Sequence, residues 1–356
     1  MNIEPAPLQA PYPAPAAPAS GARRPWLVAD IGGTNARFGY IGAGSDDILC
    51  PATLPGAAHS GPAAAAQAYL RGVAQQLGAA YAVPRAAAFA VATAVGGDQV
   101  ALTNSGWVFS RTEAQRELGL DGLLLLNDFE ALALSLPRLQ PAQLRVVPAA
   151  RAAALPGATR AVVGPGTGLG VAGLASTRHG WVALPGEGGH VTLAATDDFE
   201  QELLGAVRHH MKHRQAHVSA ERLLSGIGLP LLHSSVAAVL GQAAPEERRA
   251  SDIVAHGRDD SEQPDALCQR TVDVFCALLG AFAGNVALTL GARGGLYIGG
   301  GIVPRLGETF FRSRFRERFE AKGRFNDYLA AIPTLLILDT TTALAGAEQA
   351  LSQAQF

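Results

Sequence analysis

An amide and a carboxylate, Asn127 and Asp128, directly follow the four consecutive leucines Leu123–Leu126. The leucine run predicts a short buried strand of a parallel sheet, and the apolar pattern from Ala131 onward predicts a helix after it. In open α/β sheets, ligands bind at the carboxyl ends of the strands. Asp128 therefore occupies a position where a carboxylate can act as a general base, although either polar residue could instead simply cap the helix.

Two predicted β-hairpins, far apart in the chain, have turns built from glycine and threonine, at 32–35 and at 164–168. Adjacent glycines let backbone N–H groups approach an anion closely, and the threonine hydroxyl adds a donor. The duplication suggests two related halves that hold the two ends of a polyphosphate. Neither turn has the P-loop or the dinucleotide-binding pattern, and either one alone would fit an ordinary hairpin.

A glycine-rich segment, 184–193, contains one carboxylate and one imidazole, Glu187 and His190. The glycines would hold both side chains close to the backbone of the loop. A solvated surface loop is the simpler alternative. Zinc binding is disfavoured, because no cysteine or second histidine stands at ligand spacing.

Two further segments have both a structural and a functional interpretation. Ser219 predicts a helix N-cap, and Glu221 in the first turn of that helix would interact favourably with the helix dipole. The run Gly299–Gly301 follows a predicted strand and would let a flat ligand lie on the backbone, or let a helix and a strand pack closely.

Composition limits the classes of function. The 356 residues are 48% hydrophobic and 16% charged, which allows two domains with large interiors. A formal net charge of −2 and the lack of a basic stripe exclude nucleic acid as a partner. The apolar runs are short and broken, so no membrane span is expected. The cysteines Cys50, Cys268 and Cys276 lack metal-type spacing and predict reduced thiols in a cytoplasmic protein.

Strands and helices are expected to alternate and to position these residues. A Pro/Ala-rich tail over residues 1–25 is predicted to be disordered, without the features of a secretory signal. Strands are predicted at 26–31, 36–41, 85–95, 123–126, 161–163, 169–174, 294–298 and 334–338. Helices are predicted at 111–118, 197–213, 266–290, 311–319 and 343–353, besides the one opened by Ser219.

Six segments, taken in order, resemble those of bacterial glucokinases of the enteric type. They span residues 30–37, 127–131, 164–170, 184–190, 219–226 and 298–305. Each motif alone is weak, but six in register are specific, and the likeness runs from about Trp26 nearly to the C terminus. The zinc-ligand cysteines of the repressor-related sugar kinases have no counterpart here.

The resemblance implies the α/β fold shared by hexokinase, actin and the Hsp70 ATPase, a ribonuclease H-like fold with a cleft between a small and a large domain. The small domain would comprise 26–137 plus 339–356, and the large domain 138–338. It also implies phosphorylation of D-glucose by ATP with Mg²⁺ to give glucose 6-phosphate, the first step of glycolysis, in a cytoplasmic homodimer.

The same resemblance assigns roles to individual residues. Asp128 would be the general base, and Asp30 would orient Mg²⁺ through water. Sugar contacts would come from Asn127, Asp128, Glu187, His190 and Glu221. ATP would contact Ala29, Asp30, Ile31, Gly32, Gly33, Thr34, Gly166, Thr167, Gly168, Gly299 and Gly300.

Other functions remain open on the same fold, because fold alone does not settle function. A filament subunit or a sugar-sensing regulator could bind ATP without transferring its phosphate. A kinase could act on another hexose, or use polyphosphate as donor. The joint presence of Asp128, Glu187 and His190 favours catalysis on a sugar, and we expect glucose to be preferred over galactose and mannose.

Overall fold

The computed structural model describes residues 25–43, 47–93, 95–102, 106–149, 152–211, 217–243, 247–339 and 341–354. The tail predicted over 1–25 lies outside the described residues, except for Pro25. The described residues form two compact units. Unit 1 consists of 141–178 and 186–338, and unit 2 of the residues up to 140, 179–185 and the residues from 339 onward.

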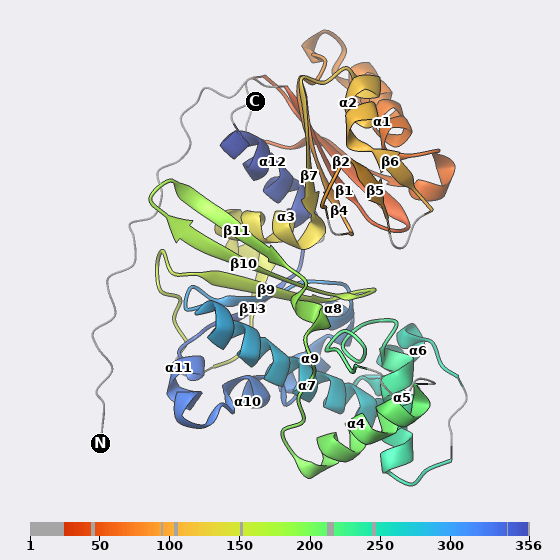
Figure 1. The fold of residues 1–356 in the computed structure, drawn as a ribbon, viewed down its shortest axis with the longest axis vertical. Coiled ribbons are helices and arrows are strands. Elements are labelled where there is room, and N and C mark those ends of the chain that lie inside the picture. Colours follow the sequence, from red (N-terminus) through yellow and green to blue (C-terminus); the bar gives the residue numbers. More distant parts are fainter. Residues whose placement is uncertain are drawn as a thin grey trace. The chain divides into compact units, whose positions relative to one another are not determined.

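Unit 2 contains a five-stranded sheet in the order β3-β2-β1-β4-β7 (Figure 1). Its strands are β1 (Trp26–Ile31), β2 (Asn35–Ile41), β3 (Leu49–Pro55), β4 (Ala86–Val91) and β7 (Gly122–Asn127). Strands β1, β4 and β7 are parallel, and their last residues are in register, so that the chain leaves all three at one edge of the sheet. The predicted parallel strand at the leucine run is confirmed, but β7 is an edge strand, and Leu124 and Leu125 are only half-buried.

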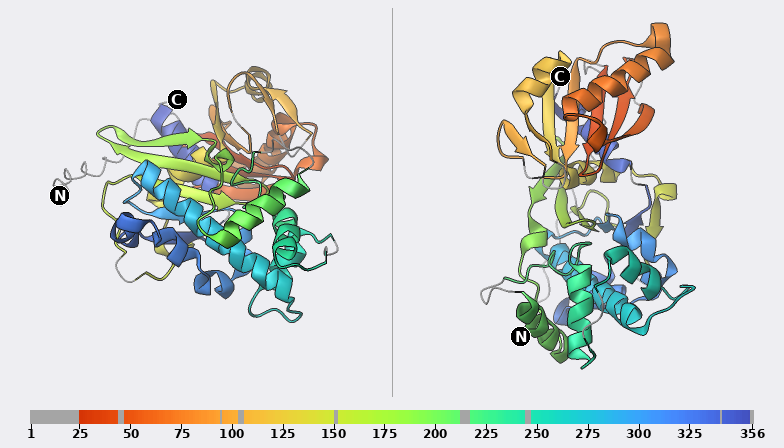
Figure 2. Two further views of the ribbon diagram at one scale, coloured as in Figure 1. Left: turned by 60° about the horizontal axis from the view of Figure 1, so that its bottom comes forward. Right: turned by 90° about the vertical axis from the view of Figure 1, so that its right-hand side faces the viewer.

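Helices cover both faces of this sheet. Side chains alternate along β1, so Leu27 and Ala29 join the core on the α1 side while Trp26 and Val28 contact the core on the α12 side. Figure 2, on the right, shows the orange helix α1 lying across the red strands. The remaining elements of unit 2 are α1 (Pro62–Leu77), β5 (Gln99–Ala101), β6 (Val108–Ser110), α2 (Arg111–Leu118), α3 (Asp128–Ser135) and α12 (Thr342–Ala354), with most of β11 (Gly180–Gly186).

Unit 1 contains five neighbouring strands in the order β10-β9-β12-β13-β8. They are β8 (Leu144–Val146), β9 (Arg160–Pro165), β10 (Leu169–Thr177), β12 (Leu296–Ile298) and β13 (Thr334–Ile337). Strands β9 and β10 form the second predicted hairpin, which is confirmed. Strand β12 runs parallel to β9, so the loop after β12 and the turn after β9 lie at the same edge of this sheet.

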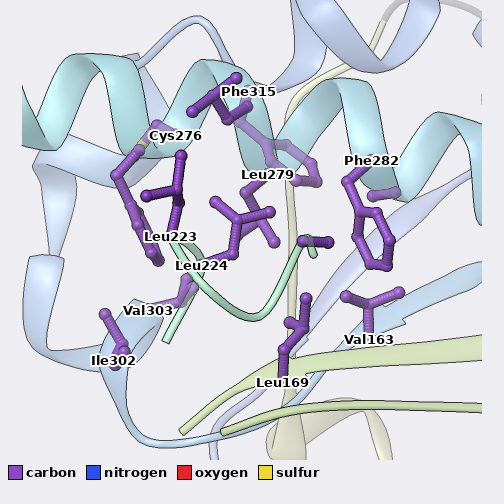
Figure 3. Close-up of a cluster of buried hydrophobic side chains, with 14 of the residues drawn as sticks. Val163, Leu169, Leu223, Leu224, Cys276, Leu279, Phe282, Ile302, Val303 and Phe315 are labelled. Atoms are coloured by element: carbon purple, nitrogen blue, oxygen red, sulfur yellow. The ribbon is translucent and has the colours of Figure 1, made fainter. Parts of the chain in front are cut away.

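The helix predicted over 266–290 is confirmed as α7 (Ala266–Leu290), and it contributes to the core of unit 1. Its side chain Phe282 lies opposite Val163 of β9, and Cys276 and Leu279 belong to the same core (Figure 3). Asp265 caps its start, and Gly291 ends it in the left-handed conformation. The other helices of unit 1 are α4 (Asp198–His210), α5 (Leu229–Val239), α6 (Ala250–Gly257), α8 (Ile302–Leu306), α9 (Glu308–Arg312), α10 (Phe315–Glu320) and α11 (Asn326–Ala330).

By length and composition, α7 is the one helix among the described residues that could cross a membrane. However, 83% of its most apolar stretch is buried within the protein. Such burial is what the core helix of a large domain shows, because its apolar side chains are already covered by neighbouring elements.

Several predicted elements differ from the structure, among them the strand predicted over 294–298, which begins at Leu296, and the helix predicted over 197–213, which ends at His210. The strand predicted over 85–95 ends at Val91, and the helix predicted over 311–319 is divided into α9 and α10 around Ser313. The Ser313 hydroxyl accepts a hydrogen bond from the N–H of Phe315, which starts a new helix. The helix predicted after Ser219 is wrong, since Ser219 forms an isolated β-bridge with Thr192 and residues 220–228 form turns and bends.

Candidate functional site

Asn127 lies where β7 leads into α3, and two hydrogen bonds fix its side chain. Its Oδ1 accepts from the N–H of Phe129 at 2.9 Å, and its Nδ2 donates to the carbonyl of Thr93 at 3.2 Å. The carboxylate of Glu130 accepts from the N–H of Asn127, and burial raises the pKa of Glu130. This reciprocal arrangement resembles a capping box and assigns the capping function to Asn127. The amide is thereby held at the carboxyl edge of the sheet.

Asp128 is the first residue of α3, one position past the cap. Its Oδ1 accepts from the N–H of Phe129 at 2.9 Å, and the residue is half-buried. The N-terminal end of a helix interacts favourably with a negative charge, so an acidic side chain suits this position. The alternative in which Asp128 serves as the cap does not fit, because Asn127 already occupies that position.

The first glycine turn, residues 32–34, joins β1 and β2 at the same edge of unit 2. The N–H of Gly32 bonds to the carbonyl of Asn35 at 3.0 Å, and the carbonyl of Thr34 accepts from Gly56 at 2.8 Å. Gly33 lies between them in the turn. Ala29 and Ile31 are fully buried strand residues, so only their backbone could meet a nucleotide.

Asp30 lies in β1 directly opposite Arg37 of β2, and is 9% exposed. The Nη1 of Arg37 is 2.9 Å from Oδ2 of Asp30. Burial raises the pKa of Asp30, while the Arg37 guanidinium opposes that shift. Arg37 is not among the predicted site residues, although its cross-strand position opposite Asp30 follows from the hairpin itself.

Asp30 could contribute one carboxylate to a magnesium site, but it does not belong to a larger cluster of metal-binding side chains among the described residues. No cluster of three or more His, Cys, Asp or Glu side chains able to hold a metal ion occurs among the described residues. Mg²⁺ commonly keeps several waters and needs only one or two protein carboxylates beside substrate phosphates. Asp30, with one oxygen paired to Arg37, suits an ion of that kind.

The second glycine turn, residues 166–168, joins β9 and β10 in unit 1. The N–H of Gly166 donates to the carbonyl of Gly168 at 2.8 Å. The carbonyl of Gly166 accepts from Gly226 at 2.8 Å, which attaches the 219–228 turns to this hairpin. Thr167 at the tip is exposed. The turn therefore presents one side to solvent and is supported by the chain on another.

Three of the predicted sugar-contact residues gather beside this turn. His190 Nε2 is 3.8 Å from Glu187 Oε2, and His190 Nδ1 is 3.8 Å from Glu221 Oε1. The segments that carry them are joined by the N–H of Glu221, which bonds to the carbonyl of Gly189 at 2.9 Å. The side chains of His190 and Glu187 are 58% and 65% exposed, as the solvated-loop alternative expects, but together with Glu221 they converge from two separate segments of the chain.

The glycines after β12 are explained first by close packing. Gly300 has a positive φ of 75°, and a Cβ there would collide with the carbonyl oxygen of Pro165. The N–H of Gly299 bonds to the carbonyl of Val163 at 2.9 Å. The backbone of this loop consequently lies against the end of β9, next to the second glycine turn.

By residue type, Asn104 and Trp107 could also line a polar cleft. Trp107 is 9% exposed and belongs to the core of unit 2, where its indole N–H donates to the carbonyl of His59 at 3.2 Å. Asn104 lies outside the described residues. The candidate residues thus form one group in unit 2, at the ends of β1 and β7, and one in unit 1, around the second glycine turn.

Comparisons with known proteins agree on one family. The family profile described as Glucokinase matches residues 27–354. A glucokinase of Aromatoleum aromaticum is 48% identical over 333 residues, covering 93% of this chain and 95% of that protein. A glucokinase of Neisseria meningitidis is 45% identical over 327 residues, covering 92% of this chain and 94% of that protein.

Solved structures extend the comparison to the fold. The crystal structure of a glucokinase from an Antarctic psychrotroph matches with a TM-score of 0.80 at 38% identity, covering 92% of this chain and 98% of that chain. A glucokinase of the ROK family from Streptomyces griseus, solved with glucose and AMPPNP, matches with a TM-score of 0.56 at 18% identity, covering 91% and 98%. The latter likeness concerns the fold alone.

The family match, the curated relatives and the structure at 38% identity define a sugar kinase of the actin-like ATPase superfamily. More narrowly, the chain belongs to the glucokinase family, and it is a kinase that phosphorylates glucose.

Proposed function

We propose that this chain transfers the γ-phosphoryl group of ATP to the 6-hydroxyl of D-glucose, with Asp128 as general base. The observation that carries the proposal is the convergence of Glu187, His190 and Glu221 at the second glycine turn. Acceptors and donors from three side chains suit a ligand with many hydroxyl groups, and a glycine turn beside them suits a phosphate.

The chemistry requires alignment more than covalent assistance. Phosphoryl transfer depends on holding the attacking oxygen in line and on neutralising phosphate charge. Asp128 would hydrogen-bond the 6-hydroxyl and accept its proton as the new bond to phosphorus forms. Backbone N–H groups of the two glycine turns would stabilise charge on the transferring group. Mg²⁺, held through water by Asp30, would supply further charge neutralisation.

The arrangement of the enzyme follows the same proposal. Unit 2 would be the small domain and unit 1 the large domain, with a cleft between them that takes both substrates. Gly299 and Gly300 would form part of the adenosine side of that cleft. We further propose a homodimer in the cytoplasm that acts in glycolysis. Three free thiols, at Cys50, Cys268 and Cys276, support a reducing compartment.

Replacing Glu187 by Gln should weaken glucose binding and leave ATP affinity unchanged. The amide keeps the shape of the side chain but loses the charge and one acceptor, so a sugar hydroxyl loses a charge-assisted hydrogen bond. We expect kcat/KM for glucose to fall roughly five- to a hundredfold. Glu202→Gln, an exposed glutamate of α4, is the matched control and should behave as wild type. A defect of Glu187→Gln confined to ATP would remove Glu187 from the sugar site.

The wild-type enzyme should use glucose better than its epimers galactose and mannose. A site built to bond hydroxyl groups leaves buried polar atoms unpaired when one hydroxyl is misplaced, at about 1–3 kcal/mol for each. Measurement of kcat/KM for the three hexoses, with ATP, ADP and polyphosphate as donors, tests this expectation. Equal use of galactose and glucose would contradict the proposed sugar contacts.

A further inference from the structure

The carboxylate of Glu221 fills the inner side of the second glycine turn. Its Oε2 accepts a hydrogen bond from the N–H of Leu169 at 2.9 Å, directly after the turn. Leu169 is 4% exposed, and the Glu221 carboxylate supplies the acceptor for its N–H. A buried donor without an acceptor is costly, so the turn and the carboxylate hold each other in place.

Gly168 is a glycine for the same reason. A Cβ at this position would be 2.5 Å from Oε2 of Glu221, closer than non-bonded atoms approach. The backbone of Gly168 has no positive φ that would itself demand glycine. Gly166, two residues earlier in the same turn, has nothing within 4 Å of its Cβ position. The constraint at 168 therefore comes from Glu221 and not from the turn conformation.

The other end of the turn is supported by the same segment of chain. The N–H of Gly226 donates to the carbonyl of Gly166 at 2.8 Å, and the N–H of Ile227 to the carbonyl of Thr167 at 3.5 Å. Residues 219–228 therefore contact the turn at both ends. Of the three hydrogen bonds described, those of Gly226 and Ile227 come from the backbone, and that of Glu221 comes from the side chain.

We infer that Glu221 is a positioning residue for the second glycine turn, in addition to its proposed contact with the sugar. One carboxylate oxygen holds Leu169, and the other lies 3.8 Å from His190, on the side where the sugar would bind. Glu221 thus acts on the nucleotide through the turn and on the sugar directly. The inference rests on the proposed function in one respect, namely that the turn binds a nucleotide phosphate.

A binding measurement without sugar separates this role from a sugar contact. Titration of ADP and Mg²⁺ into each variant by calorimetry, in the absence of glucose, should show Glu221→Ala binding ADP about tenfold more weakly than wild type. Glu187→Ala, which removes a carboxylate of the same cluster that does not touch the turn, should bind ADP as wild type does. Melting temperatures of the three proteins establish that each is folded at the temperature of titration.

A double substitution provides a second test that does not depend on the absolute affinity. Gly168→Ala should weaken ADP binding in the wild-type background, because its Cβ meets the Glu221 carboxylate. In the Glu221→Ala background the same substitution should have little further effect, since the obstructing oxygen is gone. Gly166→Ala is the matched control, and its effect on ADP binding, whatever its size, should be the same in both backgrounds.

Two results would overturn the inference. One is ADP binding by Glu221→Ala equal to that of wild type, and the other is an equal loss in Glu187→Ala. Additive effects of Gly168→Ala and Glu221→Ala would contradict the steric argument. Failure of the proposed function is seen separately, as an absence of glucose-dependent ADP release by the wild-type enzyme, whereas the inference is judged on the difference between variants in sugar-free ADP binding.

Discussion

The variant Asp128→Asn should fold normally and bind glucose almost normally, but its kcat should fall about 10²–10⁴-fold. Asparagine keeps the size and hydrogen-bonding shape of the side chain, and its Oδ1 can still accept from the N–H of Phe129. The amide cannot take the proton of the attacking hydroxyl, so the loss is confined to the chemical step. A coupled assay of ADP release, with glucose and ATP each varied, separates kcat from KM.

The control for this variant lies at the opposite end of the same strand. Asp121 directly precedes β7 and forms an exposed ion pair with Arg85 at 2.6 Å. Exposed pairs of this kind contribute about 1 kcal/mol or less, so Asp121→Asn should leave kcat unchanged. If Asp128→Asn retained more than about a tenth of the wild-type kcat, the role of general base would be wrong.

Replacing Gly346 by Ala should strongly destabilise unit 2. Helix α12 passes α3 so closely at this residue that a Cβ would overlap the carbonyl oxygen of Ala131. Both partners are backbone, so relief requires the two helices to move apart. We expect a loss of about 3 kcal/mol or more in the free energy of unfolding. Because α3 begins at Asp128, the folded fraction should also lose kcat, as misplacement by about 1 Å can cost about a hundredfold.

Gly72→Ala, in the same unit, is the matched control for Gly346→Ala. Gly72 is an exposed glycine of α1, and its Cβ position has nothing within 4 Å. Alanine there should stabilise the protein by about 0.5–1 kcal/mol through its helix propensity. Thermal and urea unfolding of both variants would show the contrast. Equal melting temperatures for Gly346→Ala and Gly72→Ala would mean that the α3–α12 contact is not as close as described.

Elements with strong local patterns were predictable from the sequence. The hairpin of β1 and β2, helix α2 and helix α7 occur where apolar periodicity, caps and terminal glycines place them. The turns at 219–228 were not predictable from the sequence, because contacts with residues distant in the chain determine their conformation. The hydroxyl of Ser219 does accept from the N–H of Arg222, as a cap would. However, the N–H of Gly226, which in a continuous helix would bond to the carbonyl of Arg222, bonds instead to the carbonyl of Gly166, so the chain does not continue as a helix.

The candidate site, too, was only partly predictable from the sequence. The residue types and motifs identify Asp128, Glu187 and His190 as candidate functional residues, because carboxylate and imidazole side chains can be recognised in the sequence itself. The sequence could not reveal that Glu221 bonds to Leu169, because 52 residues separate them. Likewise, the glycine at 300 meets a purely steric requirement set by Pro165 on another strand.

The central claim is that this kinase transfers phosphate to the 6-hydroxyl of glucose. The most direct test compares ADP release from ATP in the presence of D-glucose, of 6-deoxy-D-glucose and of no sugar. We predict turnover only in the reaction that contains D-glucose. 6-Deoxy-D-glucose should inhibit that reaction competitively, because it keeps the other hydroxyls but lacks the attacking oxygen. Equal turnover in all three reactions, or turnover with the 6-deoxy sugar, would contradict the account.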